Sequence, residues 1–399
     1  MNPLGEGLTC RSASGLKPLP QEPRRLAVLG AGTVGAELLQ RLSVLDPSSL
    51  RLCLVATSRW RCFDAAGLVP QDALSQLRQA QARNACGAET GATPIADADS
   101  VARQSAMGVA GGSSPCQHHG CGELPADFGP GDIVVDATAS ESLAAWHPRW
   151  LRRGLHVVTA NKRGIGGPLL RHQRIRQRSA RGPHYGDAAT VGAGLPLLRT
   201  VRELRSGGDR VRALAGVLSG TLAWLFDGYD GAAPFSERVR AAVARGYAEP
   251  DPRVDLSGED VRRKLLILAH AAGHGLEAGD VQVESLLTPA LEQATDATSR
   301  DTALGSLDDL LGARARAAAR EGRVLCYVAR LDDAGARIGL EALPRDDALA
   351  QGGACDNRVA LWSCRYADRP LVIQGPGAGA GVTAAALLDD IQRALARSL

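Results

Sequence analysis

The feature that most constrains the fold is a glycine-rich turn directly after a short apolar run. Residues 25–30 read RLAVLG, and the GxGxxG pattern that begins at Gly30 leads into AELLQRL. A buried strand, a tight turn and a helix in this order let a pyrophosphate approach the backbone N–H groups at a helix N-terminus. The pattern predicts a dinucleotide site at Gly30, Gly32, Thr33, Val34 and Gly35.

Further apolar runs follow at the spacing of successive strand–helix units. They are LRLCLVAT, DIVVDATAS and LHVVTANK. This spacing predicts an α/β fold with a Rossmann-type, doubly wound parallel sheet over residues 24–165. Residues 1–23 read as a flexible tail, and residues near 84–130, rich in Gly, Ala, Ser, Cys and His, read as an insertion.

The sequence after residue 165 predicts a second, mixed α/β domain. Residues 166–365 alternate apolar runs such as VRALAGVLS with helical patterns, and we expect them to bind substrate and mediate dimerisation. Residues 366–399 contain a glycine loop that leads into a helix, and we expect this segment to return to the cofactor domain.

Composition excludes several classes of function. The chain has 399 residues, a formal charge of +3 and only 4% aromatic residues, which gives no reason to expect a nucleic-acid or membrane partner. No apolar run approaches the roughly 18 residues of a membrane span, and the N-terminus lacks a signal-peptide pattern. The nine cysteines are scattered without disulfide-like spacing, which favours a reduced compartment. We therefore expect a cytoplasmic enzyme with a small-molecule substrate.

The end of the second predicted strand bears on the choice of dinucleotide. NAD sites commonly carry an acidic residue there that binds the ribose 2′-hydroxyl. This chain instead reads ATSRWR, with Arg59 and Arg61. The missing carboxylate and the nearby arginines favour the 2′-phosphate of NADP, with NAD as the alternative if these are ordinary surface arginines.

Two lysines are candidates for chemistry. Of 46 basic residues only Lys17, Lys162 and Lys264 are lysines. Arginine stays protonated, whereas lysine can give up its proton, so a chain that uses arginine almost everywhere has reason to keep lysine where a proton moves. Asp260 and Lys264 lie four apart on one predicted helical face. Together with Glu249 upstream, the cluster suits a substrate that carries an ammonium group.

Long, ordered motifs resemble the homoserine dehydrogenase family, in particular the dehydrogenase portion of bifunctional aspartokinase–homoserine dehydrogenases. They are TVGAGLP, GVLSGTLAWLF, FSERVRAAVARGYAEPDPRVDLSGEDVRRKLLILA, VVDATAS and HVVTANK. The resemblance implies reversible reduction of L-aspartate 4-semialdehyde to L-homoserine, a step toward threonine, methionine and isoleucine, by an enzyme that is a homodimer or a larger homo-oligomer.

The resemblance also implies roles for individual residues. Lys264 would be the proton donor, with Lys162 and Asp260 beside it as catalytic residues. Substrate would contact Glu249, Asp255, Asp260, Gly220, Thr221 and Tyr247. Cofactor would contact the glycine turn together with Arg59, Thr138, Ser140, Lys162, Gly377 and Thr383.

A monovalent cation, sodium or potassium, is implied at a set of backbone carbonyls. They belong to Ala188, Val191, Ala193 and Leu195. Most family members carry an acidic residue at the position of Ala188, whereas here Asp187 precedes it by one place. Because the contact is through a backbone oxygen, we expect the site to weaken rather than vanish.

Two rival functions remain open from the sequence. One is a different amino-acid-linked NAD(P) dehydrogenase on the same architecture, and the other is a catalytically decayed cofactor-binding subunit that pairs with a separate aspartokinase. Weaker signals are a Cys/His cluster at Cys116–Cys121, which matches no strong zinc pattern, and the pair His270 and His274, which we interpret as packing histidines.

Overall fold

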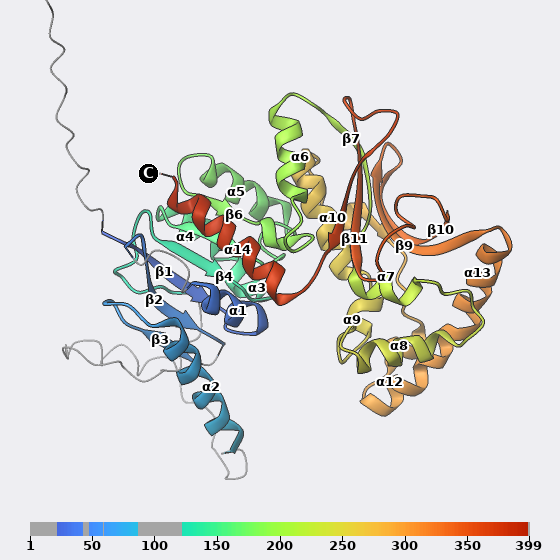
Figure 1. The fold of residues 1–399 in the computed structure, drawn as a ribbon, viewed down its shortest axis with the longest axis horizontal. Helices are drawn as coiled ribbons and strands as arrows, with labels where there is room; N and C mark the ends of the chain where they lie inside the picture. The colour runs from blue at the N-terminus through green and yellow to red at the C-terminus, as the bar shows by residue number, and fades with distance from the viewer. Residues whose placement is uncertain (1–21, 43–47, 59, 87–121, 398–399) are drawn as a thin grey trace, which may run out of the picture.

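The structure is a computed structural model that describes residues 22–42, 48–58, 60–86 and 122–397. It has two lobes, each built on a six-stranded sheet (Figure 1). The first sheet has the order β3-β2-β1-β4-β5-β6. Its strands are β1 (Arg24–Leu29), β2 (Leu50–Ala56), β3 (Arg61–Phe63), β4 (Ile133–Asp136), β5 (His156–Thr159) and β6 (Tyr185–Gly186).

The first sheet confirms the predicted Rossmann-type arrangement. Strands β2, β1, β4, β5 and β6 pair in parallel, and only the edge strand β3 is antiparallel. The side chains of β1 pack alternately into two separate hydrophobic cores, with Leu26 and Val28 in one and Ala27 and Leu29 in the other. Both faces of the sheet are therefore buried, which explains why its strands read as continuous apolar runs.

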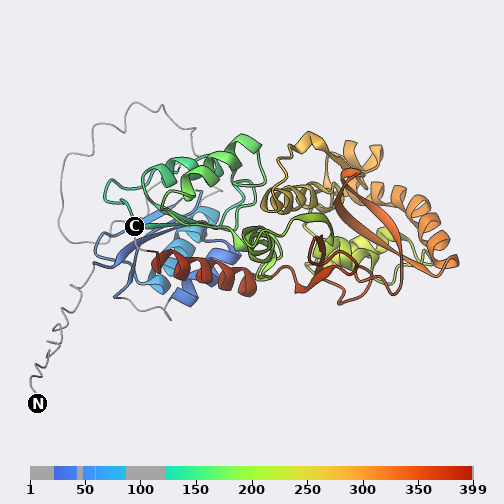
Figure 2. The same ribbon diagram turned by 90° about the horizontal axis from the view of Figure 1, so that it is seen from above.

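Helices cover this sheet on its two faces. They are α1 (Thr33–Leu42), α2 (Pro70–Cys86), α3 (Glu141–Ala144), α4 (His147–Arg152) and α5 (Leu169–Ser179), joined by α14 (Ala380–Leu395) from the far end of the sequence. Helix α14 lies beside α1, as both views show (Figures 1 and 2). Its buried residues, among them Leu387 and Ile391, join the same core as Leu38 and Leu39 of α1.

The second sheet has the order β12-β11-β7-β9-β10-β8. Its strands are β7 (Val211–Val217), β8 (Val281–Val283), β9 (Arg323–Asp332), β10 (Gly335–Pro344), β11 (Asp356–Ser363) and β12 (Leu371–Pro376). All neighbours are antiparallel except β8 and β10, so this is the mixed α/β unit that the sequence predicts.

The remaining helices surround the second sheet and link it to the first lobe. They are α6 (Leu197–Ser206), α7 (Gly220–Phe226), α8 (Phe235–Ala244), α9 (Arg253–Leu256), α10 (Glu259–Ala272), α11 (Pro289–Gln293), α12 (Ala297–Ala303) and α13 (Asp308–Arg320), with short 3₁₀ turns η3 (Ala188–Thr190), η4 (Ala278–Asp280) and η5 (Leu304–Leu307). Helix α10 packs against α6 and β9. None of the helices in the described ranges is long and apolar enough to cross a bilayer.

Candidate functional site

Asp260 lies between the two lysines that the sequence singles out. Its carboxylate oxygens are 2.8 Å from Nζ of Lys264 and 3.2 Å from Nζ of Lys162. Asp260 and Lys264 occupy one face of α10, whereas Lys162 follows β5 in the first lobe. Burial acts to raise the pKa of Asp260, but the charges and hydrogen bonds of both lysines outweigh it and hold that pKa well below its usual range. The carboxylate therefore stays charged at neutral pH.

Lys264 is held in one orientation by two acceptors. Besides Asp260, its Nζ donates to the carbonyl oxygen of Leu218, 2.7 Å away, at the end of β7. The residue is only 8% exposed, so its ammonium group is largely withdrawn from water. An ammonium group has three donors, and two are used, which leaves one for a further acceptor. This is the arrangement expected of a positioned proton donor.

Glu249 and Asp255 lie together, close enough to Asp260 for the charges of Asp255 and Asp260 to interact. The backbone N–H of Glu249 donates to the Asp255 carboxylate at 2.9 Å. Burial raises the pKa of Asp255, and the negative charges of Glu249 and Asp260 add to that rise, while the hydrogen bond from Glu249 N–H lowers it in part. The site therefore holds several carboxylates close together, which suits a substrate with an ammonium group.

The loop that carries Glu249 is tied to the start of α7. The hydroxyl of Thr221 donates to the carbonyl oxygen of Tyr247 at 2.7 Å. The Tyr247 ring, 46% exposed, lies 5.4 Å from the ring of Trp224. Gly220 is the first residue of α7, where Ser219 caps the helix by accepting from Leu222 N–H. The structure places Lys162, Asp260 and Lys264 in direct contact. It also joins Thr221 to Tyr247 and Glu249 to Asp255, with Gly220 next to Thr221 at the start of α7.

The glycine turn after β1 is shaped for close approach of a ligand. Gly30 has φ +95°, and a Cβ at Gly35 would lie 1.8 Å from the carbonyl oxygen of Gly30, so both positions need glycine to form the turn. A Cβ at Gly32, in contrast, would meet no atom of the described residues within 4 Å. Gly32 therefore leaves open space at the N-terminus of α1, where Thr33 is exposed and no acidic residue occupies the first turn. An anionic group fits this position.

A buried network that the sequence did not reveal supports the ends of β4 and β5. Asp136, with no exposed surface, accepts hydrogen bonds from Thr138 N–H and hydroxyl, from His147 Nε2 at 2.9 Å and from Asn161 Nδ2 at 2.8 Å. His147 also hydrogen-bonds Tyr185 Oη through Nδ1 at 2.9 Å. Because Asn161 immediately precedes Lys162, the network fixes the backbone that carries this lysine.

The other predicted cofactor residues lie at two places. Thr138 and Ser140 follow β4, where Ser140 caps α3 by accepting from Leu143 N–H. Gly377 and Thr383 lie before and within α14, on the segment that returns to the first lobe. A Cβ at Gly377 would lie 1.3 Å from Oδ1 of the buried Asn357, so this contact requires glycine.

The predicted cation segment is a tight series of turns between β6 and α6. Ala193 has φ +51° and is the only non-glycine residue at positive φ within the described ranges; it follows Gly192 at φ +73°. Such a conformation is costly away from glycine, and it often marks functional backbone. The carbonyl oxygen of Leu195 accepts from Leu197 N–H at 2.8 Å. Asp187, one place before Ala188, is buried and forms ion pairs with Arg176 and Arg202. It therefore does not replace the missing acid at Ala188.

Some predictions made from the sequence fall outside the described residues. These are Arg59, the Cys116–Cys121 cluster, nearly all of the predicted tail and most of the predicted insertion. Among the residues that the structure does describe, no group of three or more His, Cys, Asp or Glu side chains could hold a metal. The two ring nitrogens of buried His270 lie 3.1 and 2.8 Å from the carbonyl oxygens of Ile165 and Leu276, and one of them donates a hydrogen bond, as expected of a packing histidine. Cys62 is disulfide-bonded, which the scattered cysteine spacing did not predict.

Comparison with known proteins identifies the family. Residues 196–392 match the family profile described as Homoserine dehydrogenase, and residues 30–184 match the profile described as Homoserine dehydrogenase, NAD binding domain. A homoserine dehydrogenase from Emericella nidulans is 38% identical over 279 residues, which cover 66% of this chain and 76% of that protein. The chain belongs to the homoserine dehydrogenase family of NAD(P)-dependent oxidoreductases.

Longer homoserine dehydrogenase relatives are similar over a part of their length. The bifunctional aspartokinase/homoserine dehydrogenase 1 of Zea mays, a chloroplastic protein, is 43% identical over 269 residues, 67% of this chain. The matched region spans only 29% of that relative. Among solved structures, a hyperthermophilic archaeal homoserine dehydrogenase in complex with NADPH superimposes with a TM-score of 0.66 at 17% identity, covering 93% of this chain and 97% of that one. At this identity the likeness concerns the fold.

Proposed function

We propose that this protein is an NADP-preferring homoserine dehydrogenase that interconverts L-aspartate 4-semialdehyde and L-homoserine. The observation that carries the proposal is the bridge from Lys162 through Asp260 to Lys264, next to Glu249 and Asp255. A small-molecule substrate, a homodimeric or larger homo-oligomeric assembly and a cytoplasmic location belong to the same proposal.

Reduction of an aldehyde creates negative charge on its oxygen, and the site has the groups to receive it. Bound NADPH supplies the hydride. Lys264 holds one unused N–H, stabilises the developing alkoxide and donates its proton to that oxygen. Asp260 and the Leu218 carbonyl hold Nζ in place for this transfer. Arginine in the same place would stabilise the charge but hardly release a proton.

The carboxylates of the site and the first residues of α7 bind the amino-acid end of the substrate in this proposal. Glu249 and Asp255 attract the substrate ammonium group, and Asp260 contributes while it positions the lysines. Gly220, Thr221 and Tyr247 form the adjoining wall, because the Thr221–Tyr247 hydrogen bond joins α7 to the Glu249 loop. A substrate that lacks an ammonium group would leave Glu249 and Asp255 without a cationic partner.

The preference for NADP rests on the end of β2. Ala56, Thr57 and Ser58 stand where a ribose-binding carboxylate would stand in an NAD site. Arg61 begins the adjacent edge strand β3. In this proposal Arg59 and Arg61 provide the positive charge that a 2′-phosphate requires. The turn at Gly30, Gly32, Thr33, Val34 and Gly35 would hold the pyrophosphate, with Thr138, Ser140, Lys162, Gly377 and Thr383 around the rest of the cofactor.

A monovalent cation forms part of the proposal. The carbonyl oxygens of Ala188, Val191, Ala193 and Leu195 would hold it, and the positive φ of Ala193 supports a functional constraint on this turn. Sodium or potassium at this place would fix the segment between β6 and α6. Gly194, within that segment, lies close to α14, because a Cβ on it would be 3.3 Å from the carbonyl oxygen of Val382. A bound cation would therefore also help to hold the returning segment in place.

Absorbance at 340 nm tests the proposal directly. Purified protein is mixed with L-homoserine and either NADP⁺ or NAD⁺, with and without sodium or potassium. We expect the signal to grow, and to grow faster with NADP⁺. A flat trace with homoserine despite measurable NADPH binding would favour a decayed cofactor-binding subunit, and turnover with another amino alcohol instead would favour a different dehydrogenase.

A further inference from the structure

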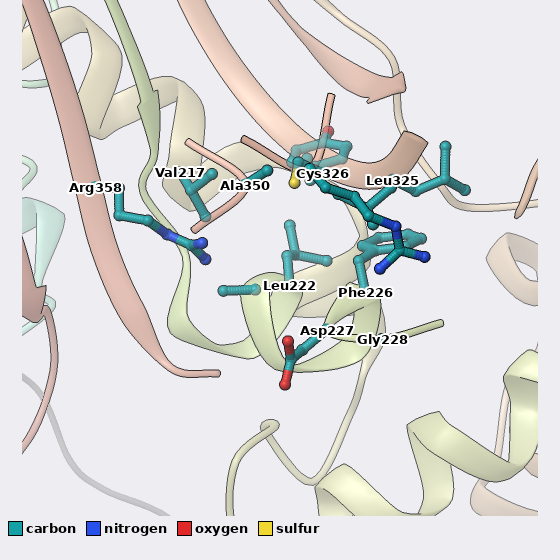
Figure 3. A pocket seen from close by; sticks show the side chains of 13 residues that line it. Val217, Leu222, Phe226, Asp227, Gly228, Leu325, Cys326, Ala350 and Arg358 are labelled. Atoms are coloured by element: carbon teal, nitrogen blue, oxygen red, sulfur yellow. The ribbon is translucent and has the colours of Figure 1, made fainter. Parts of the chain in front are cut away.

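A cavity lies in the second lobe between α7 and the second sheet. Figure 3 shows the side chains that line it. They come from β7, α7, β9 and β11 and from the loop that precedes β11. Its volume is about 200 Å³, far above the roughly 10–15 Å³ that one water molecule needs. The cavity therefore has room for a small organic molecule.

This cavity is distinct from the Lys264 site, although the two are neighbours. None of the predicted catalytic, substrate or cofactor residues lines it. Val217 lines the cavity, and the next residue, Leu218, carries the carbonyl oxygen that holds Lys264. Helix α7 connects the two places, since Thr221 at its start adjoins the Glu249 loop while Phe226 at its end lines the cavity.

Arg358 brings an unpaired positive charge to the cavity. The residue is only 5% exposed, and Figure 3 shows its guanidinium group directed inward. Nη1 donates to the carbonyl oxygen of Gln351 at 2.8 Å, but Nε has no hydrogen-bond partner among the residues that the structure describes. Within the described residues no carboxylate lies within the 4.0 Å of an ion pair with it. A buried guanidinium without a counter-ion is unfavourable, so the site is incomplete as it stands.

The nearby acidic groups do not supply the missing charge. Burial raises the pKa of the Cys326 thiol to about 11, even though the charge of Arg358 acts to lower it, so this side chain is neutral at pH 7. Asp227 and Arg345 also line the cavity, but both are exposed and their charges are opposite. The charge left uncompensated is the single one of Arg358, which a monocarboxylate balances and a dianion such as phosphate exceeds.

We propose that this cavity binds a small monocarboxylate with an apolar body. The carboxylate would pair with the Arg358 guanidinium, which can present two N–H donors to two oxygens. The apolar body would contact the hydrocarbon side of the cavity, formed by Val217, Leu222, Ala223, Phe226 and Ala350. One buried charge next to an apolar patch, with the charged side chains of Asp227 and Arg345 at the exposed edge, resembles the usual composition of small-ligand sites.

Binding of isovalerate to the full chain at pH 7 tests this proposal. Isovaleramide has the same shape without the charge and serves as the control ligand. We expect saturation-transfer NMR to detect isovalerate and not isovaleramide, with the signal retained when homoserine and NADP⁺ are present. Equal signals from both ligands, no signal from isovalerate, or its displacement by homoserine would overturn the proposal.

Two variants locate the binding to the cavity. Arg358→Gln removes the charge and should weaken isovalerate binding at least tenfold. Arg181→Gln, on an exposed arginine of the first lobe, is the matched control and should bind as the parent does. Ala350→Phe fills the cavity from a partly exposed loop and keeps Arg358, so it should also abolish binding even if Arg358→Gln fails to fold. Parent-like binding by folded Ala350→Phe would refute the assignment.

Discussion

The side-chain nitrogen of Lys264 lies 2.7 Å from the carbonyl oxygen of Leu218. This bond joins α10 to the end of β7, so the second sheet sets the position of the proposed proton donor. The same Nζ also lies 2.8 Å from the carboxylate of Asp260. With both contacts in place, the remaining N–H has a defined direction, which is the condition for efficient proton transfer.

Lys264→Arg should keep the positive charge and lose the proton donor. We expect kcat to fall by about 10²–10⁴-fold, the usual contribution of a positioned general acid. NADPH affinity should change little, because no predicted cofactor contact is altered. Steady-state kinetics and fluorescence titration with NADPH measure the two quantities. Near-normal turnover in this variant would exclude Lys264 as the donor.

The raised pKa of Asp255 gives a pH dependence with a definite sign. As pH falls, this carboxylate becomes neutral at a higher pH than the ordinary value of about 3.9, so the attraction for the substrate ammonium group weakens early. The KM for homoserine should therefore rise as the medium is acidified toward that pKa. In Asp255→Asn the KM should be higher at pH 8 and less dependent on pH.

The same substitution should affect stability in the opposite direction. A carboxyl group whose pKa is raised by folding favours the folded state when neutral, and this benefit is lost as pH rises through the folded pKa. Asp255→Asn should therefore melt no lower, and at pH 8 slightly higher, than the parent protein. A large loss in melting temperature would mean that the carboxylate is needed for the fold rather than for the substrate.

Gly32→Ala should separate cofactor binding from folding. A Cβ here meets no protein atom within 4 Å, so the melting temperature should be unchanged. The methyl group would occupy the space proposed for the pyrophosphate, and we expect NADPH to bind on the order of tenfold more weakly, about 1.4 kcal/mol. Calorimetric titration gives the dissociation constant. Unchanged affinity would place the pyrophosphate elsewhere.

Gly258→Ala should destabilise the protein through a steric contact at the start of α10. Gly258 has φ +76°, and a Cβ would lie 2.4 Å from Oη of Tyr327, which is held by its hydrogen bond to the Glu284 carbonyl. Gly208 is the matched control, because it has φ +80° and open space around it. Gly208→Ala should cost about 1–2 kcal/mol from the backbone alone.

Gly258→Ala should lose about 1–3 kcal/mol more, the typical cost of overpacking. Urea unfolding of both variants measures the difference. Equal losses would mean that Tyr327 moves aside without cost.

Local patterns predicted the parts of the site that are close in sequence. The four-residue spacing of Asp260 and Lys264 placed them on one helical face, and the structure confirms the contact. The approach of Lys162 to Asp260 could not come from spacing, because it depends on how the two lobes pack. We predicted this approach only from the resemblance to the homoserine dehydrogenase family.

Buried polar contacts between elements far apart in the chain could not be predicted from the sequence. Asp136 closes an apolar strand, His147 begins α4 and Tyr185 begins β6, and nothing in their spacing indicates one network. Arg358 likewise reads as one more arginine in a chain where arginine is by far the commoner basic residue. Only its burial, and the absence of a partner for its Nε in the described part of the chain, distinguish it.

The two ends of the cofactor domain meet at Arg24. Its guanidinium donates to the carbonyl oxygens of Ala394 at 2.9 Å and Arg397 at 2.8 Å. The first residue of β1 therefore contacts residues that are synthesised last. At about 5–20 residues per second, a ribosome needs roughly 10–40 s to pass from Gly186 of β6 to Ala380 of α14. During that interval the second lobe can fold, while the apolar face that α14 later covers stays exposed to solvent.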